Sequence, residues 1–210
     1  MKIMQLCVGM VGTNCYIVYD EKSREAAVID PGDNAPSILQ AITQEKLNVR
    51  YVLLTHAHFD HILAAHEVLQ ATGAKYVVPE ADMWLLKREN MGQFRSFARS
   101  YVEDVPDVTA GEGTQVAFGG LTAAYMSTPG HTPGSSVIRI GDVLFTGDTL
   151  FRQECGRCDL EGGDFGQMLR SLRRLYELEG DYKVMPGHEG LSTLAEERKY
   201  NPYMLQAVGK

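Results

Sequence analysis

The sequence predicts an α/β fold in which two β-sheets face one another with helices on the outside. Short apolar runs of β-like composition alternate with helical patterns along the chain, and the two halves carry comparable sets of both. Tight turns rich in glycine join these segments, and no long linker or repeat interrupts them. A sheet must bury an apolar face against another layer, which favours a layered arrangement. The length of 210 residues suits one large domain, so we expect residues 1–210 to form a single domain.

In the first half the predicted strands cover residues 3–8, 15–20, 25–30, 51–55 and 75–79, and the predicted helices cover residues 36–46 and 61–72. The third strand ends at Asp30-Pro31-Gly32, where proline and glycine force a loop. Ile38 and Ile42 share one face of the first helix. Gly73 follows the second helix in the position of a C-terminal cap.

Residues 81–105 are harder to interpret, and they predict either two helices or a helix and a loop. Phe94, Phe97 and Tyr101 lie at helical spacing within this segment. Such spacing is typical of a stripe that faces the core. A lid over a site or a subunit contact is the alternative.

The second half follows the same plan without repeating the sequence. Its predicted strands cover residues 114–118, 121–127, 136–140, 143–146 and 182–185, and its predicted helices cover residues 165–178 and 192–200.

Composition and charge narrow the possible partners. The chain is 44% apolar, its net charge is −7, and no long basic run is present, so we expect no nucleic-acid partner. No stretch approaches ~18 uninterrupted apolar residues, so we expect no membrane partner. The first residues do not resemble a secretory signal, and the four cysteines are too few for a disulfide scaffold. We therefore expect a cytoplasmic protein with a small-molecule substrate, either a monomer or a homodimer.

The strongest chemical signal is His56-Ala57-His58-Phe59-Asp60-His61, directly after the apolar run of residues 51–54. Imidazole nitrogen and carboxylate oxygen are ligands that borderline cations such as Zn²⁺ prefer. Histidines at positions i and i+2 can converge on one ion when the backbone is extended or turned. Asp60 and His61 can then reach a second ion. This segment predicts a metalloenzyme.

Three more candidate ligands follow predicted strands of the second half: His131, Asp148 and His188. Each is flanked by glycine, which lets backbones approach closely and turn sharply. Three such positions in addition to the first cluster favour one shared metal cleft. The sixth histidine, His66, lies five positions beyond His61, and we expect it to be a surface or core residue.

The order of these motifs, together with Asp30-Pro31-Gly32, resembles the metallo-β-lactamase superfamily over nearly the whole chain. The resemblance implies a four-layer αββα sandwich with a two-metal site between the edges of its sheets. It implies that metal 1 is held by His56, His58 and His131, that metal 2 is held by Asp60, His61 and His188, and that Asp148 bridges both. Asp30, Thr55 and Thr149 would support the ligand loops.

Two such cations, which we expect to be zinc with iron or manganese as alternatives, suit hydrolysis. Cations ~3.5–4 Å apart can share a hydroxide, lower the pKa of its parent water and polarise a carbonyl. The bridging hydroxide would then be the nucleophile, and metal 1 would stabilise the developing oxyanion. Asp60 is the expected catalytic residue, which orients the nucleophile or carries its proton.

Within the superfamily, residues 146–151 and Cys155-Gly156-Arg157 resemble the glyoxalase II-like branch, the hydroxyacylglutathione hydrolases. The resemblance implies a thioester hydrolase similar to short, single-domain members. Arg157 stands at the position of a cation that holds the glutathione moiety, and arginine can clamp a carboxylate bidentately. The alternative is that Arg157 lies on the surface or pairs with Glu154 or Asp159, the latter standing where the branch has an aromatic residue.

Other functions remain open. Within the same fold they are a sulfur (persulfide) dioxygenase with one iron and a lactonase or other ester hydrolase. A metal-binding module without catalysis is the alternative from another class. Cys155 and Cys158 form a C-x-x-C pair, which we interpret as two reduced loop cysteines.

Overall fold

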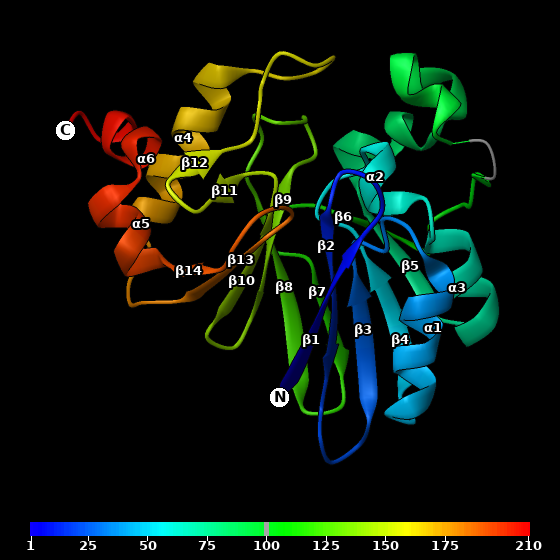
Figure 1. Cartoon of the computed structure of the whole chain (residues 1–210). Coiled ribbons are helices and arrows are strands. Elements are labelled where there is room, and N and C mark those ends of the chain that lie inside the picture. The colour runs from blue at the N-terminus through cyan, green and yellow to red at the C-terminus, as the bar shows by residue number, and fades with distance from the viewer. Residues whose placement is uncertain (99–100) are drawn as a thin grey trace.

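Two six-stranded β-sheets lie face to face, and helices cover the outer face of each, so the chain forms four layers (Figure 1). The computed structural model describes residues 1–98 and 101–210. The predicted αββα sandwich is confirmed. No helix in these described ranges is both long and apolar enough to span a membrane.

The first sheet is built from the first half of the chain. Its strands, in spatial order, are β1 (Lys2–Val8), β2 (Thr13–Tyr19), β3 (Glu25–Ile29), β4 (Asn48–Leu53), β5 (Lys75–Pro79) and β6 (Val108–Ala110). Strands β1 to β3 pair antiparallel, and β3 to β6 pair parallel. Two helices, α1 (Ala35–Gln44) and α3 (Ala65–Thr72), provide the crossovers that parallel pairing requires.

The second sheet is built from the second half. Its strands, in spatial order, are β14 (Ser192–Thr193), β13 (Lys183–Pro186), β10 (Val143–Gly147), β9 (Ser136–Ile140), β8 (Leu121–Ser127) and β7 (Gln115–Phe118). Its outer face is covered by α4 (Phe165–Tyr176), α5 (Leu194–Tyr200) and α6 (Pro202–Ala207) (Figure 1). A short ribbon of β11 (Leu150–Phe151) and β12 (Glu154–Cys155) follows β10.

Strand β2 shows how one sequence fills two core layers. Its residues alternate between faces, so Cys15 and Ile17 pack toward the helices while Tyr16 and Val18 face the second sheet. Between the sheets, the ring of Tyr16 meets Phe145 edge to face with centroids 5.2 Å apart. Because both faces are buried, the strand is apolar throughout its centre.

The helix predicted over residues 61–72 is wrong as one element. It is divided into α2 (Phe59–Ile62) and α3, and the chain leaves helical geometry at Ala64. The amide of Ala64 donates to the carbonyl of Pro31 at 2.9 Å instead of continuing the helix. The predicted cap is confirmed, since Gly73 has φ 66°. The break leaves α2 as a separate turn that carries metal-ligand candidates.

The helix predicted over residues 192–200 also needs correction, because its first two residues form β14. The helix α5 starts only at Leu194, where Thr193 and Glu196 form a capping box. The short elements β6, β11, β12 and α6 were not predicted.

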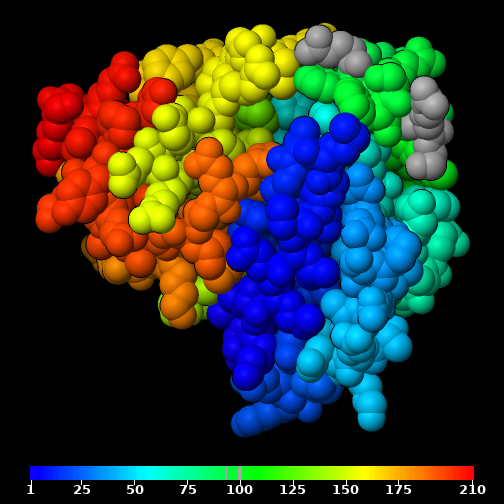
Figure 2. Space-filling view, viewed as in Figure 1, coloured from blue at the N-terminus to red at the C-terminus, as the bar shows by residue number. Residues whose placement is uncertain are grey.

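The segment 81–105 forms two short 3₁₀ helices, η1 (Glu80–Leu86) and η2 (Arg88–Ser96), with a kink at Gly92. Residues 99 and 100 of this segment lie outside the described residues. The three aromatics do not form one core-facing stripe, since Tyr101 is buried and Phe97 is 52% exposed. In Figure 2 this green segment meets the blue tip of the β1–β2 hairpin and the yellow residues beyond β12 at one end of the molecule.

Candidate metal centre

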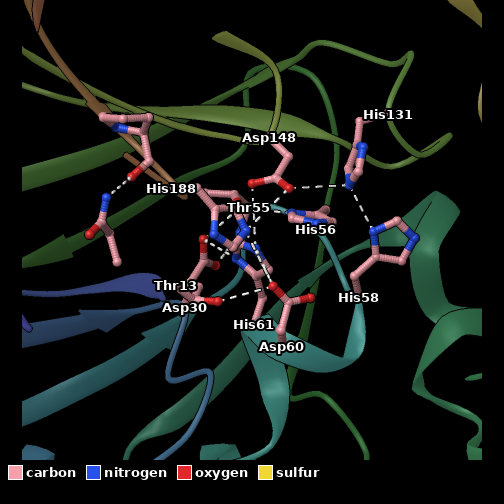
Figure 3. A network of polar contacts seen from close by, with 12 residues as sticks. Thr13, Asp30, Thr55, His56, His58, Asp60, His61, His131, Asp148 and His188 are labelled. Carbon is pink, nitrogen blue, oxygen red and sulfur yellow. Dashed lines mark hydrogen bonds and ion pairs between the residues drawn. The ribbon is translucent and has the colours of Figure 1, made fainter. Parts of the chain in front are cut away.

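All seven predicted ligands meet at one end of the two sheets (Figure 3). His56 and His58 lie in the loop after β4, while Asp60 and His61 lie in α2. The other three, His131, Asp148 and His188, follow β8, β10 and β13. Strand ends are rigid, so side chains far apart in sequence can point into one small volume.

The first group of ligand atoms belongs to His56, His58 and His131, and these atoms lie within 4.8 Å of one another. His58 Nδ1 and His131 Nε2 are 2.8 Å apart, with the rings nearly perpendicular (Figure 3). Two ring nitrogens that face each other so closely suit a shared cation.

The second group belongs to Asp60, His61 and His188. Asp60 Oδ2 lies 3.2 Å from His188 Nε2 and 3.6 Å from His61 Nε2. One carboxylate and one imidazole from α2 and a second imidazole from the loop after β13 thus converge on a second point.

Asp148 lies between the two groups. Its Oδ2 is 3.4 Å from His131 Nε2 and 3.5 Å from His188 Nε2, and its Oδ1 is 3.4 Å from His61 Nε2. Each carboxylate oxygen is therefore near imidazoles, and the residue contacts both groups. This is the arrangement of a bridging ligand.

The donor set fits two divalent cations. Among the described residues, His56 Nε2, His61 Nε2 and Asp148 Oδ1 are buried side-chain atoms without a hydrogen-bond partner. Buried polar groups without partners cost free energy and call for an explanation. Cations bound by the two groups would give these atoms their partners.

Electrostatics prepares the ligands differently in the two groups. Burial lowers the pKa of His56 well below its ordinary value and that of His58 to about 3, with neighbouring imidazoles adding to the effect. Both are therefore neutral and able to ligate. Burial also acts on His61 and His188, but nearby carboxylates outweigh it and raise the pKa of each. Despite burial, His61 and His188 keep the pKa of Asp60 below the usual range, and His61, His131 and His56 do the same for Asp148.

Asp30 supports the site without reaching it. Its Oδ2 accepts from His61 Nδ1 at 3.0 Å and from the Thr55 hydroxyl at 2.6 Å, while Oδ1 accepts from the Thr55 amide at 2.8 Å. Such a contact fixes the ring orientation of a ligating histidine. Thr149 likewise bonds to Thr128 in the loop before His131, at 2.9 Å.

Sequence reasoning missed Asp82, a fully buried carboxylate in η1. Oδ2 accepts from the Ala57 amide at 3.1 Å and from the Thr132 hydroxyl at 2.7 Å, and Oδ1 accepts from the Gly134 amide at 2.7 Å. Asp82 therefore joins the loop of His56 and His58 to the loop of His131. No motif marks this residue, because its partners lie in distant segments.

Thr13 was also missed. Its hydroxyl donates to Asp60 Oδ2 at 3.0 Å, so the first residue of β2 orients a candidate ligand of the second group. By contrast, His66 pairs with Asp104 at 3.0 Å, away from the ligands.

Arg157 lies in the wall of the pocket over the ligands, which has a volume of about 340 Å³. Its guanidinium makes two hydrogen bonds of 2.6 Å to the Asp159 carboxylate. Its carbonyl accepts from His131 Nδ1 at 2.7 Å. The backbone of this turn thus orients a metal ligand, a role that the sequence did not suggest.

The turn at Gly156 packs directly against the ligand loops. A Cβ at this position would collide with the carbonyl oxygen of Asp148 and approach His131 Nδ1. Only glycine lets the backbones come this close.

Comparison with known proteins identifies relatives of this chain. The family model for the metallo-beta-lactamase superfamily matches residues 8–188. An uncharacterized protein of Aquifex aeolicus is 35% identical over 97% of each chain. Hydroxyacylglutathione hydrolase GloC of Haemophilus influenzae is 30% identical, over 91% of this chain and 92% of its own.

Solved structures agree on the architecture. The BLEG-1 B3 metallo-beta-lactamase aligns with a TM-score of 0.89 at 32% identity, over 97% of this chain and 99% of its own. ETHE1 from Myxococcus xanthus aligns with a TM-score of 0.82 at 30% identity, over 100% of this chain and 86% of its own. TTHA1623, solved in a di-iron-bound form, aligns with a TM-score of 0.84 at 31% identity, over 95% of this chain and 99% of its own.

Proposed function

The chain belongs to the metallo-beta-lactamase superfamily, and we propose from this premise that it is a dinuclear metal-dependent hydrolase of thioesters. The observation that carries the proposal is the position of Asp148, whose carboxylate lies within 3.5 Å of histidines from both ligand groups. Both groups form in one pocket, which suits two cations acting on one substrate.

His56, His58 and His131 would hold one ion and Asp60, His61 and His188 the other, with Asp148 shared. When bound, two such cations acidify water and polarise a carbonyl. The protein's own part is positioning: Asp30 orients His61, and the Arg157 carbonyl orients His131. We propose zinc, with iron as the alternative that the di-iron form of TTHA1623 supports.

Asp60 also faces the pocket, and Thr13 fixes its carboxylate through Oδ2. We assign Asp60 to orienting the attacking water in addition to its role as a ligand.

The pocket favours a leaving group that needs no proton. Among the described residues of its wall, every histidine and aspartate belongs to the ligand set, and no lysine, tyrosine or cysteine is present. A thiol has a pKa of about 8.5 and can leave as thiolate, whereas an amine leaving group needs an acid. The name of the GloC relative supports thioesters over the lactone and ester alternatives.

Arg157 is the proposed anchor for a carboxylate on the thiol part of the substrate. Its pair with Asp159 is exposed on both sides. A substrate carboxylate can therefore compete with Asp159 for the guanidinium.

We also propose a cytoplasmic location and a small-molecule substrate. All four cysteines lie in the described part of the chain and are free, including Cys155 and Cys158, which supports a reducing compartment.

A substrate panel on protein of measured metal content tests the proposal. We expect turnover of acylglutathione and simple acyl thioesters that rises with metal occupancy up to two ions per chain, and slower turnover of lactones and β-lactams. Oxygen consumption with a persulfide substrate at one iron per chain would replace this proposal with a dioxygenase. Tight metal binding without turnover of any substrate would replace it with a binding module.

A further inference from the structure

We call the pocket over the candidate ligands the metal pocket. Beside it lies a second hollow, which we call the side cavity. It is lined by His58, Leu85, Met91, Phe94 and Leu160, together with Phe59. His58, Phe59, Phe94 and Leu160 also line the metal pocket. The two spaces therefore adjoin at these four residues.

Phe59 lines both the side cavity and the metal pocket. It lies in the sequence between His58, a ligand of the first group, and Asp60, a ligand of the second. Its ring stacks on Phe94 with centroids 4.7 Å apart and planes 11° apart, and on Phe97 at 5.9 Å. Because both neighbours are held as ligands, this aromatic stack has a fixed position relative to the carbonyl that would be hydrolysed.

Among the described residues of its wall, the side cavity has no lysine or arginine that could bind an anion. Among these residues, the only charged side chain other than histidine is Glu161, which is exposed and acidic. Leu85 and Met91 are only 5% and 6% exposed and supply apolar surface behind Phe94. Arg157 lines the metal pocket but not the side cavity. A charged acyl group would be disfavoured here, whereas a hydrocarbon chain would be favoured.

We propose that the side cavity binds an apolar acyl chain, so that the substrates are thioesters of aliphatic or aromatic acids. This inference rests on the proposed thioester hydrolysis. The chain would leave the carbonyl beside His58 and lie against Phe94, Leu85 and Met91. The thiol part would remain on the Arg157 side of the metal pocket.

The test is a series of thioesters that share one small neutral thiol, N-acetylcysteamine, and differ in acyl length from acetyl to octanoyl. Each buried methylene contributes about a three- to fourfold gain. We therefore expect kcat/KM to rise by about this factor per added carbon until the cavity is filled. A flat or falling series would overturn the inference, while metal-dependent turnover of the acetyl compound would still leave the hydrolase proposal standing.

Two variants test the location. Leu160→Asp places a charge at the shared wall, and Met91→Trp fills the cavity without charge. Both should reduce the octanoyl-to-acetyl ratio of kcat/KM by at least about tenfold. Val105→Asp is the matched control, since Val105 is 87% exposed and outside both hollows, and its ratio should equal that of the wild type. A wild-type ratio in both cavity variants would contradict the assignment.

Binding without turnover keeps the inference testable if the variants fold poorly or no thioester is hydrolysed. Alkyl methyl ketones resemble the substrates but cannot be hydrolysed, and calorimetry on wild-type holoenzyme measures their Kd. We expect Kd to fall about three- to fourfold per methylene. A Kd independent of chain length would overturn the inference, whatever the hydrolase assay shows.

Discussion

At the scale of single residues, the ligand histidines differ in how they are kept ready for metal. His56 and His58 are neutral because burial and neighbouring imidazoles lower their pKa. His61 is held by carboxylates instead, with Asp30 on one ring nitrogen and Asp60 and Asp148 near the other. We therefore expect that removing one of these histidines lowers metal content and hydrolysis, whereas removing a histidine elsewhere in the chain does not.

His58→Ala should lower thioester hydrolysis by at least about 100-fold, because loss of a ligand exceeds the 10–100-fold cost of losing a supporting contact. Metal analysis should show fewer than two ions per chain, with an unchanged circular dichroism spectrum. The control is His66→Ala, since His66 pairs with Asp104 away from the site. Wild-type turnover at reduced metal content would contradict the two-metal proposal.

Arg157→Ala should raise KM for thioesters whose thiol part carries a carboxylate, with kcat changed by less than about threefold. Asp159→Asn frees the guanidinium and should lower the same KM. Steady-state kinetics with acylglutathione and with a neutral thioester measures both. If neither variant separates the two substrates, Arg157 is not the anchor.

A second prediction concerns Gly156, in the turn that carries Arg157. Gly156→Ala should reduce both kcat/KM and metal affinity, because its Cβ would collide with the Asp148 carbonyl and press on His131. We expect a loss of about tenfold or more in metal affinity, by displacement of two ligands. Equilibrium metal competition with a chromophoric chelator provides the measurement, and wild-type affinity would show that the loop can yield.

At the scale of elements, the site depends on short pieces that hold loops together. The 3₁₀ helix η1 contributes nothing to either sheet, yet its Asp82 bonds to loops on both sides of the site. Burial raises the pKa of this carboxyl, while its three donors favour the ionised form. The carboxylate accepts at both oxygens, which an amide cannot do.

Asp82→Asn should weaken metal binding by about 10–100-fold, as expected for a contact that supports ligands. The amide group can keep one oxygen as acceptor, but its NH₂ would face a backbone N–H. Metal competition titration and kcat against KM are the readouts, with kcat expected to fall more than KM changes. Glu80→Gln on the exposed face of η1 is the matched control. If the two variants weaken metal binding equally, Asp82 has no specific role in supporting the candidate ligands.

At the scale of the whole molecule, the site joins the two halves of the chain. The first half contributes His56, His58, Asp60 and His61, and the second contributes the other ligands. The first sheet also holds the His188 loop directly, since Tyr16 and Asn14 donate to the Pro186 carbonyl at 2.7 and 3.0 Å. Metal binding should therefore stabilise the fold as a unit.

Removal of metal by a chelator should lower the melting temperature. A ligand at 100 times its Kd stabilises the folded state by about 2.7 kcal/mol. For a chain of this size that corresponds to a fall of roughly 5–10 °C. Calorimetry with and without chelator measures it, and His58→Ala should respond less. An unchanged melting temperature would show that the halves are held together without the ions.

Prediction from sequence succeeded where the information is local. The strand runs, the Gly73 cap and the ligand order follow from apolar periodicity and residue type along short stretches. It failed for the helix of residues 61–72, because the Pro31 carbonyl that ends it lies more than thirty residues away. The same holds for β6, which pairs only with a distant strand.

The sequence by itself therefore predicted which histidines and aspartates form the candidate metal site, and that most of them follow strands. Only the tertiary structure decided how they meet: that Asp148 lies between the two groups, that Asp82 joins their loops, and that Arg157 is paired with Asp159. It alone decided that Phe59 and Phe94 wall a side cavity. The physical reason is that ligand type and periodicity are properties of a segment, whereas close packing and hydrogen bonding across distant loops arise only when both sheets assemble.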